Sequence, residues 1–158
     1  MYKRILVPVD GSATSAKGLG EAIRLAKLTG ASLELVNVVD EMSLALGVEA
    51  YATYSQDVLA ALREGAREIL EKAQQRATSA GVGVDIKAIE TFGARVADLI
   101  VDEAVAAKAD LIVIGTHGRR GIGRWLLGSD AEQILRLAPV PVLLVRGGEA
   151  ESAPASKT

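Results

Sequence analysis

The chain has 158 residues, of which 49% are apolar and 24% charged, and its formal net charge is −2. This composition is typical of a folded domain, and the slightly acidic balance argues against a nucleic-acid partner. The absence of cysteine excludes disulfides and thiolate metal sites, and the single histidine, His117, excludes zinc sites built on several histidines. No segment approaches the ~20 apolar residues of a membrane span and the amino terminus lacks a signal-peptide core, so we expect a cytoplasmic protein without membrane contact.

Short runs rich in β-branched residues alternate with helical patterns in the first half of the chain. Residues 5–9 predict a strand, and the apolar spacing over residues 15–29 predicts a helix that ends at Gly30. A second apolar run predicts a strand over residues 32–39. Residues 40–55 show no clean periodicity, so they are predicted to form a loop.

The same alternation continues to the end of the chain. It predicts, in order, a long amphipathic helix over 56–79, a strand over 83–91, a helix around 96–104, a strand over 110–114, a short helix around 131–138 that Pro139 ends, and a strand over 141–145. The strand over 110–114 is apolar throughout, which is typical of a strand covered on both faces.

Strands that alternate with helices in this way predict right-handed βαβ units. The fold class is therefore α/β, a parallel sheet with helices on both faces. No internal repeat or linker divides the chain, so we expect one domain over residues 1–146 and a disordered tail over 147–158, which is rich in Gly, Ala, Ser, Glu and Pro.

A glycine-rich segment after the fourth predicted strand has the properties of an anion site. Gly115 and Gly118 carry no Cβ, so backbone N–H groups beside them can approach phosphate oxygens closely. Gly128 and Ser129 stand at a predicted helix start, where unpaired N–H groups and the helix dipole favour phosphate, and Ser129 is expected to cap that helix. Positive charge comes from arginines within the segment, namely Arg119, Arg120 and Arg124.

Two common phosphate motifs are absent from this segment. The spacing from Gly118 to Gly123 resembles a P-loop, but Arg124 and Trp125 follow where Lys and Ser or Thr are required. The dinucleotide fingerprint also fails, because a third glycine is missing and the motif belongs after the first strand.

A different spacing does match. Gly115, Gly118, Gly128 and Ser129 follow the pattern G-x2-G-x9-G-[S/T] of the universal stress protein family. The opening strand through Asp10, the end of the second strand and the closing strand also resemble that family, in the right order. The resemblance implies a five-stranded parallel sheet of order 3-2-1-4-5, Rossmann-like, and a homodimer that pairs through the last strand, from Val140 to Val145.

The intact glycine pattern resembles that of the members that bind ATP. By this resemblance, the phosphates would lie against the four residues of the pattern, with three others adjacent: Thr116, Arg119 and Asp130. Asp10 would lie near the ribose or a phosphate-bound Mg²⁺, and Pro8 and Val9 would line the pocket. Val38 would meet the adenine through its backbone N–H and C=O groups.

The resemblance therefore implies an ATP-binding regulatory protein of the stress response. A slow ATPase or phosphotransferase is an alternative, although no lysine or convincing general base stands near the γ-phosphate position and Asp10 is the only obvious carboxylate. A dimeric scaffold without nucleotide and a flavodoxin-like flavin carrier remain further alternatives, and so does a purely structural role for Asp10 as the cap of the first helix.

Overall fold

A computed structural model describes residues 1–42, 56–116 and 127–147. Its elements in chain order are β1 (Arg4–Pro8), α1 (Ala13–Thr29), β2 (Ser32–Asp40), α3 (Gln56–Ser79), β3 (Val84–Thr91), α4 (Val96–Ala106), β4 (Leu111–Gly115), α5 (Ser129–Leu137) and β5 (Val142–Val145). The predicted loop over 40–55 and the predicted tail over 147–158 lie for the most part outside the described residues.

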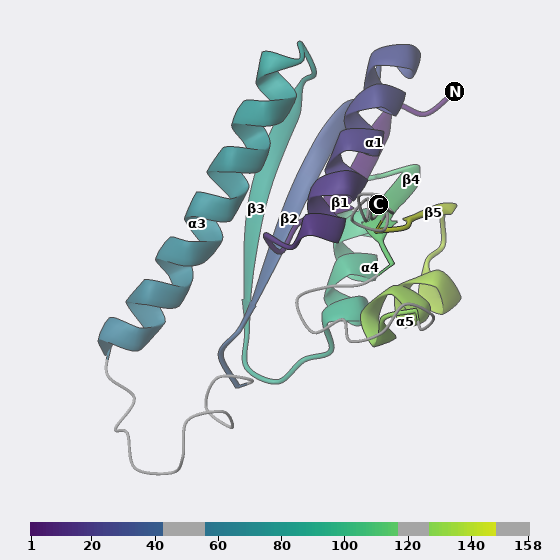
Figure 1. Cartoon of the computed structure of the whole chain (residues 1–158). Helices are drawn as coiled ribbons and strands as arrows, with labels where there is room; N and C mark the ends of the chain where they lie inside the picture. Colours follow the sequence, from purple (N-terminus) through teal and green to yellow (C-terminus); the bar gives the residue numbers. More distant parts are fainter. Residues whose placement is uncertain (43–55, 117–126, 148–158) are drawn as a thin grey trace, which may run out of the picture.

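The five strands form one parallel sheet of order β3-β2-β1-β4-β5 (Figure 1). The predicted fold class and strand order are therefore confirmed. The register places Pro8 opposite Val36 at the end of the β1–β2 pair, whereas the β2–β3 pair continues to Asp40 and Thr91. Strands β2 and β3 thus extend past the end of β1.

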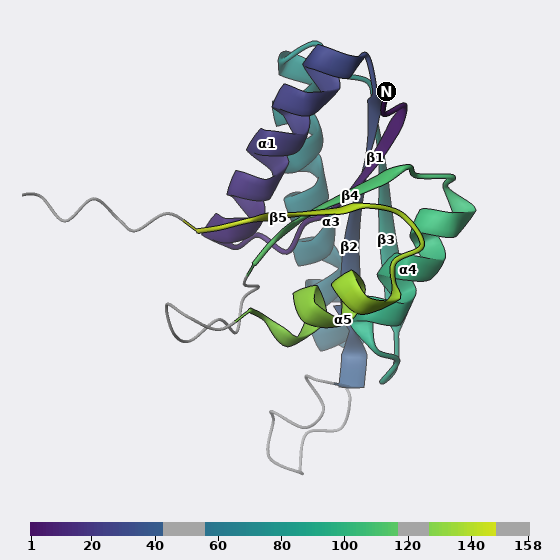
Figure 2. The ribbon, with the colours of Figure 1, turned by 90° about the vertical axis from the view of Figure 1, so that its right-hand side faces the viewer.

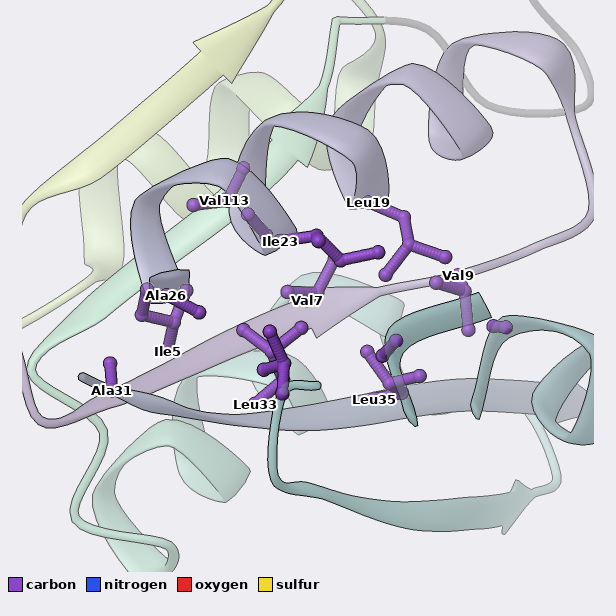
Figure 3. Close-up of a cluster of buried hydrophobic side chains, with 14 of the residues drawn as sticks. Ile5, Val7, Val9, Leu19, Ile23, Ala26, Ala31, Leu33, Leu35 and Val113 are labelled. Carbon is purple, nitrogen blue, oxygen red and sulfur yellow. The ribbon is translucent and has the colours of Figure 1, made fainter. Parts of the chain in front are cut away.

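Helices cover both faces of the sheet, with α1 on one side and α4 on the other (Figure 2). Alternate residues of a strand point to opposite faces, so β1 sends Ile5 and Val7 toward α1 and Leu6 toward α4. Figure 3 shows the α1 side, where Leu33 and Leu35 of β2 pack beneath the helix. Burial on both faces explains why the strands are nearly continuous apolar runs.

The helix boundaries follow local rules with one shift. Gly30 adopts a φ of 75° and its N–H donates to Ala26 C=O at 2.8 Å, which ends α1 as predicted. Helix α1 begins at Ala13 rather than at residue 15, because the Ser12 side chain caps it by accepting the Ser15 N–H at 3.1 Å. Helix α5 ends before Ala138, whose extended backbone is the conformation favoured before a proline.

Candidate functional site

The carboxyl ends of β1 and β4 lie side by side in the sheet. The chain proceeds from β1 outward to β2 and β3, and then crosses back to β4 on the other side of β1. Helix α1, which follows β1, and helix α5, which follows β4, therefore lie on opposite faces of the sheet, and in an open α/β sheet the crevice at such a point is where ligands bind. Pro8, Val9 and Asp10 lie at one side of this point, and Gly115 and Thr116 lie at the other.

Asp10 shapes the turn between β1 and α1. One of its carboxylate oxygens accepts the Ser12 N–H at 2.8 Å, and its own N–H donates to Ser15 Oγ at 3.2 Å. Gly11 stands between them with a φ of 82°. Since Ser12 is the residue that caps α1, the alternative that Asp10 is the cap is wrong. The carboxylate is held at the end of β1, facing the start of the helix.

The first turn of α1 packs directly on the end of β4. A Cβ on Gly115 would lie 2.8 Å from Thr14 Cγ2 and 2.9 Å from the Thr14 carbonyl oxygen. A Cβ on Gly18, one turn further along α1, would lie 3.3 Å from the backbone nitrogen of Gly115. Close packing of helix on strand is thus a sufficient reason for glycine at position 115, and sequence reasoning did not identify Thr14 or Gly18.

Two backbone hydrogen bonds fix the ends of the glycine-rich segment. The Thr116 N–H donates to Val145 C=O at 2.9 Å, which continues the pairing of β4 with β5. The Gly128 N–H donates to Thr116 C=O at 2.7 Å. Gly115 and Gly128, thirteen positions apart in the sequence, are therefore brought to the same place in the fold. Gly118 and Arg119, with Arg120 and Arg124, lie outside the described residues.

The amino terminus of α5 lies next to the hydrogen bond between Gly128 and Thr116. Gly128 is its N-cap and no side chain caps the helix, so the expectation that Ser129 is the cap is wrong: Ser129 is the first helical residue. The first N–H groups of a helix have no partner within the helix and carry partial positive charge. Asp130 and Glu132 stand in the first turn, and Glu132 forms an ion pair with Arg136 at 2.8 Å.

The part of β2 that extends past β1 forms a second side of the crevice. Backbone groups of β2 alternate between its neighbours: Val36 C=O accepts from Val9 N–H on the β1 side, whereas Leu33 N–H donates to Gly83 C=O on the β3 side. By the same alternation the N–H and C=O of Val38 face the β1 side, beyond the last pair of β1 with β2.

Two polar side chains stabilise this extension. Asn37 is 6% exposed and its Nδ2 donates to Val9 C=O at 2.7 Å. Asp40 accepts the N–H of Met42 at 3.1 Å and the N–H of Gly93 at 3.3 Å, which joins the end of β2 to the turn after β3. Asn37 was not among the predicted site residues, although an amide within an otherwise apolar strand is a signal that could have found it.

A cluster of buried charged groups lies away from the crevice, between the sheet and α4. Glu34 on β2 accepts from Arg4 at 2.6 Å, and Glu103 on α4 pairs with Lys87 at 2.5 Å. Glu34 and Glu103 are 5% and 8% exposed, and they lie close enough for Glu103 to affect the pKa of Glu34. Burial raises the pKa of Glu34, the hydrogen bonds from Arg4 oppose that rise, and the contact with Glu103 adds to it.

The described residues also form an apolar hollow of about 230 Å³ between α3 and β3. Its floor includes Leu70 and Ile86, and its two arginines are engaged in ion pairs, Arg63 with Glu90 and Arg67 with Glu71. A hollow with this lining offers little to an anion, in contrast to the amino terminus of α5.

Neither a metal cluster nor a membrane span is found in the part of the chain that the structure describes. No three carboxylate or imidazole groups there converge on a metal position. None of the described helices has both the length and the apolar character needed to cross a membrane.

Comparison with known proteins decides the family. The profile of the universal stress protein family matches residues 1–146. The chain belongs to the universal stress protein family. Its sequence is 37% identical over 146 residues to a universal stress protein of Methanocaldococcus jannaschii, with 92% of this chain and 83% of the relative covered.

Solved structures of universal stress proteins share the fold. A family member from Burkholderia pseudomallei is 35% identical, with a TM-score of 0.73 and coverage of 91% of this chain and 96% of that one. A universal stress protein from Archaeoglobus fulgidus, solved in complex with dAMP, is 25% identical, with a TM-score of 0.65 and coverage of 91% and 98%. Nucleotide binding thus occurs among universal stress proteins of the same fold.

Proposed function

We propose that this universal stress protein is a cytoplasmic ATP-binding regulatory protein, with the nucleotide held at the carboxyl ends of β1 and β4. The observation that carries the proposal is the hydrogen bond from Gly128 N–H to Thr116 C=O, because it joins the end of β4 to the open amino terminus of α5. Backbone N–H groups at such a terminus suit phosphate oxygens. The dAMP complex of the Archaeoglobus relative supports a nucleotide as the ligand.

The predicted residues fit the parts of an adenine nucleotide. Gly115, Gly118, Gly128 and Ser129 would hold the phosphates, with Thr116, Arg119 and Asp130 beside them. The adenine would lie past the end of β1, against Pro8 and Val9, where the N–H and C=O of Val38 face. The base, ribose and phosphates would then follow the crevice from β2 to β4.

Asp10 is the residue we propose for Mg²⁺. Magnesium in nucleotide sites is commonly held by one or two carboxylates together with phosphate oxygens, so a single aspartate at the end of β1 fits that requirement. A bound Mg²⁺ would neutralise phosphate charge close to the acidic first turn of α5.

A binding role is favoured over a dedicated enzyme. Asp10 is already engaged with the turn that starts α1, since it accepts the Ser12 N–H at 2.8 Å, and no described lysine belongs to the crevice residues identified above. A slow ATPase or phosphotransferase remains the second candidate, supported only by the arginines of residues 117–126.

We further propose a homodimer that pairs through the outer edge of β5, within the segment from Val140 to Val145. Strand β5 is the last of the sheet, and its residues pack on the core while the edge away from β4 has no neighbouring strand among the described residues. Pairing two such edges would remove an exposed apolar strand edge.

The first test is to denature freshly purified protein and identify any nucleotide released, by chromatography and mass. We expect ATP at up to one per chain, or uptake of ATP by empty protein in the presence of Mg²⁺. Mostly ADP would favour the ATPase candidate and call for a turnover assay. Protein that is empty and stays empty with ATP and Mg²⁺ contradicts the proposal.

The variant Gly118→Asp locates the site. A side chain and a negative charge at this position of the glycine pattern would oppose phosphate, so ATP affinity should fall at least a hundredfold, about 2.7 kcal/mol. Circular dichroism and the urea midpoint check that the variant folds, and Gly65→Ala on α3, where a Cβ meets no atom within 4 Å, is the matched control. Unchanged ATP affinity in folded Gly118→Asp protein would rule out this assignment of the phosphate site.

A further inference from the structure

The end of β1 departs from a regular parallel ladder at one carbonyl. After Val9 N–H has bonded to Val36 C=O, the next bond of the ladder would run from Val38 N–H to Val9 C=O. Instead, Val9 C=O accepts from Asn37 Nδ2 at 2.7 Å, and no backbone bond joins Val38 to Val9. A side-chain amide has taken the place of a main-chain donor.

The bond from Asn37 to Val9 affects which backbone groups of Val38 remain available at the crevice. Asn37 lies on the α1 face of β2 with Leu33 and Leu35, is 6% exposed, and reaches the carbonyl from within the protein. The N–H and C=O of Val38 lie on the β1 side of β2, past the point where β1 has turned away. One buried amide therefore occupies the Val9 carbonyl, while the alternation of the strand turns the backbone donor and acceptor of Val38 to the β1 side.

We propose that Asn37 is a positioning residue that determines base specificity, because it occupies the Val9 carbonyl and so leaves the backbone of Val38 to recognise adenine. The inference rests on the proposed function, since it concerns the same nucleotide site. Asn37 itself does not touch the base.

The chemistry of the two purines gives the specificity. Adenine offers a donor, its 6-amino group, next to an acceptor, its N1 atom, and these match the C=O and N–H of one strand residue. Guanine carries the reverse arrangement at the same edge, an acceptor at O6 and a donor at N1. A site with a fixed backbone donor and acceptor discriminates strongly between such patterns, because the wrong base leaves polar groups unpaired.

Hydrogen exchange on the nucleotide-free protein tests the role of Asn37 directly. In the wild type, the Val38 amide should exchange faster than the Val36 amide on the same strand. In Asn37→Leu, which removes the donor and keeps the number and branching of side-chain heavy atoms, Val9 C=O is released and Val38 N–H should bond to it, so Val38 exchange should slow at least tenfold. Equal protection of Val36 and Val38 in the wild type, or no slowing in the variant, overturns the inference.

Nucleotide affinity tests the consequence for specificity. Loss of one neutral hydrogen bond to the base should lower ATP affinity about three- to tenfold in Asn37→Leu. GTP affinity should change less, so the ratio of ATP to GTP affinity should fall. Leu33→Val, a buried substitution on the same face of β2 that does not reach Val9, should leave this ratio unchanged. An unchanged ratio in folded Asn37→Leu overturns the inference.

The two measurements separate this inference from the proposed function. If the wild-type protein binds neither ATP nor GTP, both the proposed function and the role of Val38 in base recognition are contradicted. The exchange rate of the Val38 amide would still show whether Asn37 keeps Val38 from bonding to Val9. If Asn37→Leu fails to fold, Asn37→Val, which also lacks the donor and suits a strand, is the second variant for both measurements.

Discussion

Single side chains in this protein carry charge into places that the sheet and helices keep from water. Glu34 and Glu103 lie near each other between β2 and α4, where Arg4 pairs with Glu34 and Lys87 pairs with Glu103. Removing the positive charge of Arg4 or Lys87 would leave a buried carboxylate without its partner, which costs more than the loss of an exposed ion pair. The cluster therefore links the edge of the sheet to α4 by electrostatics as well as by packing.

The raised pKa of Glu34 predicts a pH dependence of stability. Burial raises this pKa above the unfolded value of about 4.3, so the protonated carboxyl stabilises the folded state below that value and the contribution is lost as pH rises through the folded pKa. The free energy of unfolding of Glu34→Gln, measured in urea from pH 4 to pH 7, should therefore increase relative to that of the wild type as pH rises, because glutamine cannot ionise.

Glu71→Gln, at a half-exposed carboxylate on α3, is the matched control for that series. Its stability relative to the wild type should change far less between pH 4 and pH 7. A constant difference between Glu34→Gln and the wild type over the same range would contradict the assignment of a raised pKa to Glu34.

At the scale of elements, α1 packs closely on the end of β4. This contact depends on two glycines that face each other, Gly18 in the helix and Gly115 at the end of the strand, with Thr14 in the adjoining first turn. The helix can approach the strand this closely only because neither position carries a Cβ. The position of the amino terminus of α1, and so of Asp10, depends on that approach.

Gly115→Ala should lower the free energy of unfolding by about 1 to 3 kcal/mol, since the added methyl group would enter the space of Thr14 at 2.8 Å. The measurement is urea denaturation followed by circular dichroism. Gly65→Ala in α3 should have the opposite sign, a gain of about 0.4 to 1 kcal/mol, because nothing lies near its Cβ and alanine favours the helix. A neutral Gly115→Ala would show that the close approach is relaxed in solution.

The helices and strands could be predicted from the sequence, whereas the side-chain hydrogen bonds that join or start them could not. Periodicity and end signals such as Gly30 depend on neighbouring residues, so they are legible in the sequence alone. The start of α1 was misplaced because Ser12 and Ser15, three residues apart, decide it by one side-chain bond. The bond of Asn37 to Val9 spans 28 positions, and no local pattern reveals such a partner.

For the whole molecule, the two edges of the sheet differ. Strand β3 forms one edge, and several of its side chains are exposed, whereas the four residues of β5 at the other edge are all half-buried and pack on both halves of the core. Two bonds orient β5: Ile112 N–H donates to Pro141 C=O at 3.0 Å, and Thr116 N–H to Val145 C=O at 2.9 Å. The backbone groups of residues 142 and 144 therefore face outward, and these are the groups a second copy would meet.

Leu144→Pro should abolish the proposed dimer, because it removes an outward N–H while the bonds of β5 to β4 remain. The expected result is a halved mass in sedimentation equilibrium with the circular dichroism spectrum retained. Leu144→Ala, which shortens the side chain but keeps the N–H, is the matched control and should stay dimeric. A monomeric wild type, or a dimeric Leu144→Pro, would contradict pairing through this edge.

The hydrogen bond between Thr116 and Gly128 also bears on how such proteins diverge. It joins the two residues that flank residues 117–127, Thr116 and Gly128, at the end of the sheet. Because the flanking residues are fixed to each other, related proteins could replace or lengthen this stretch without shifting β4 or α5. Sequence changes that alter how phosphate groups are held could then accumulate in this stretch, while the base would still meet the backbone of Val38 on β2.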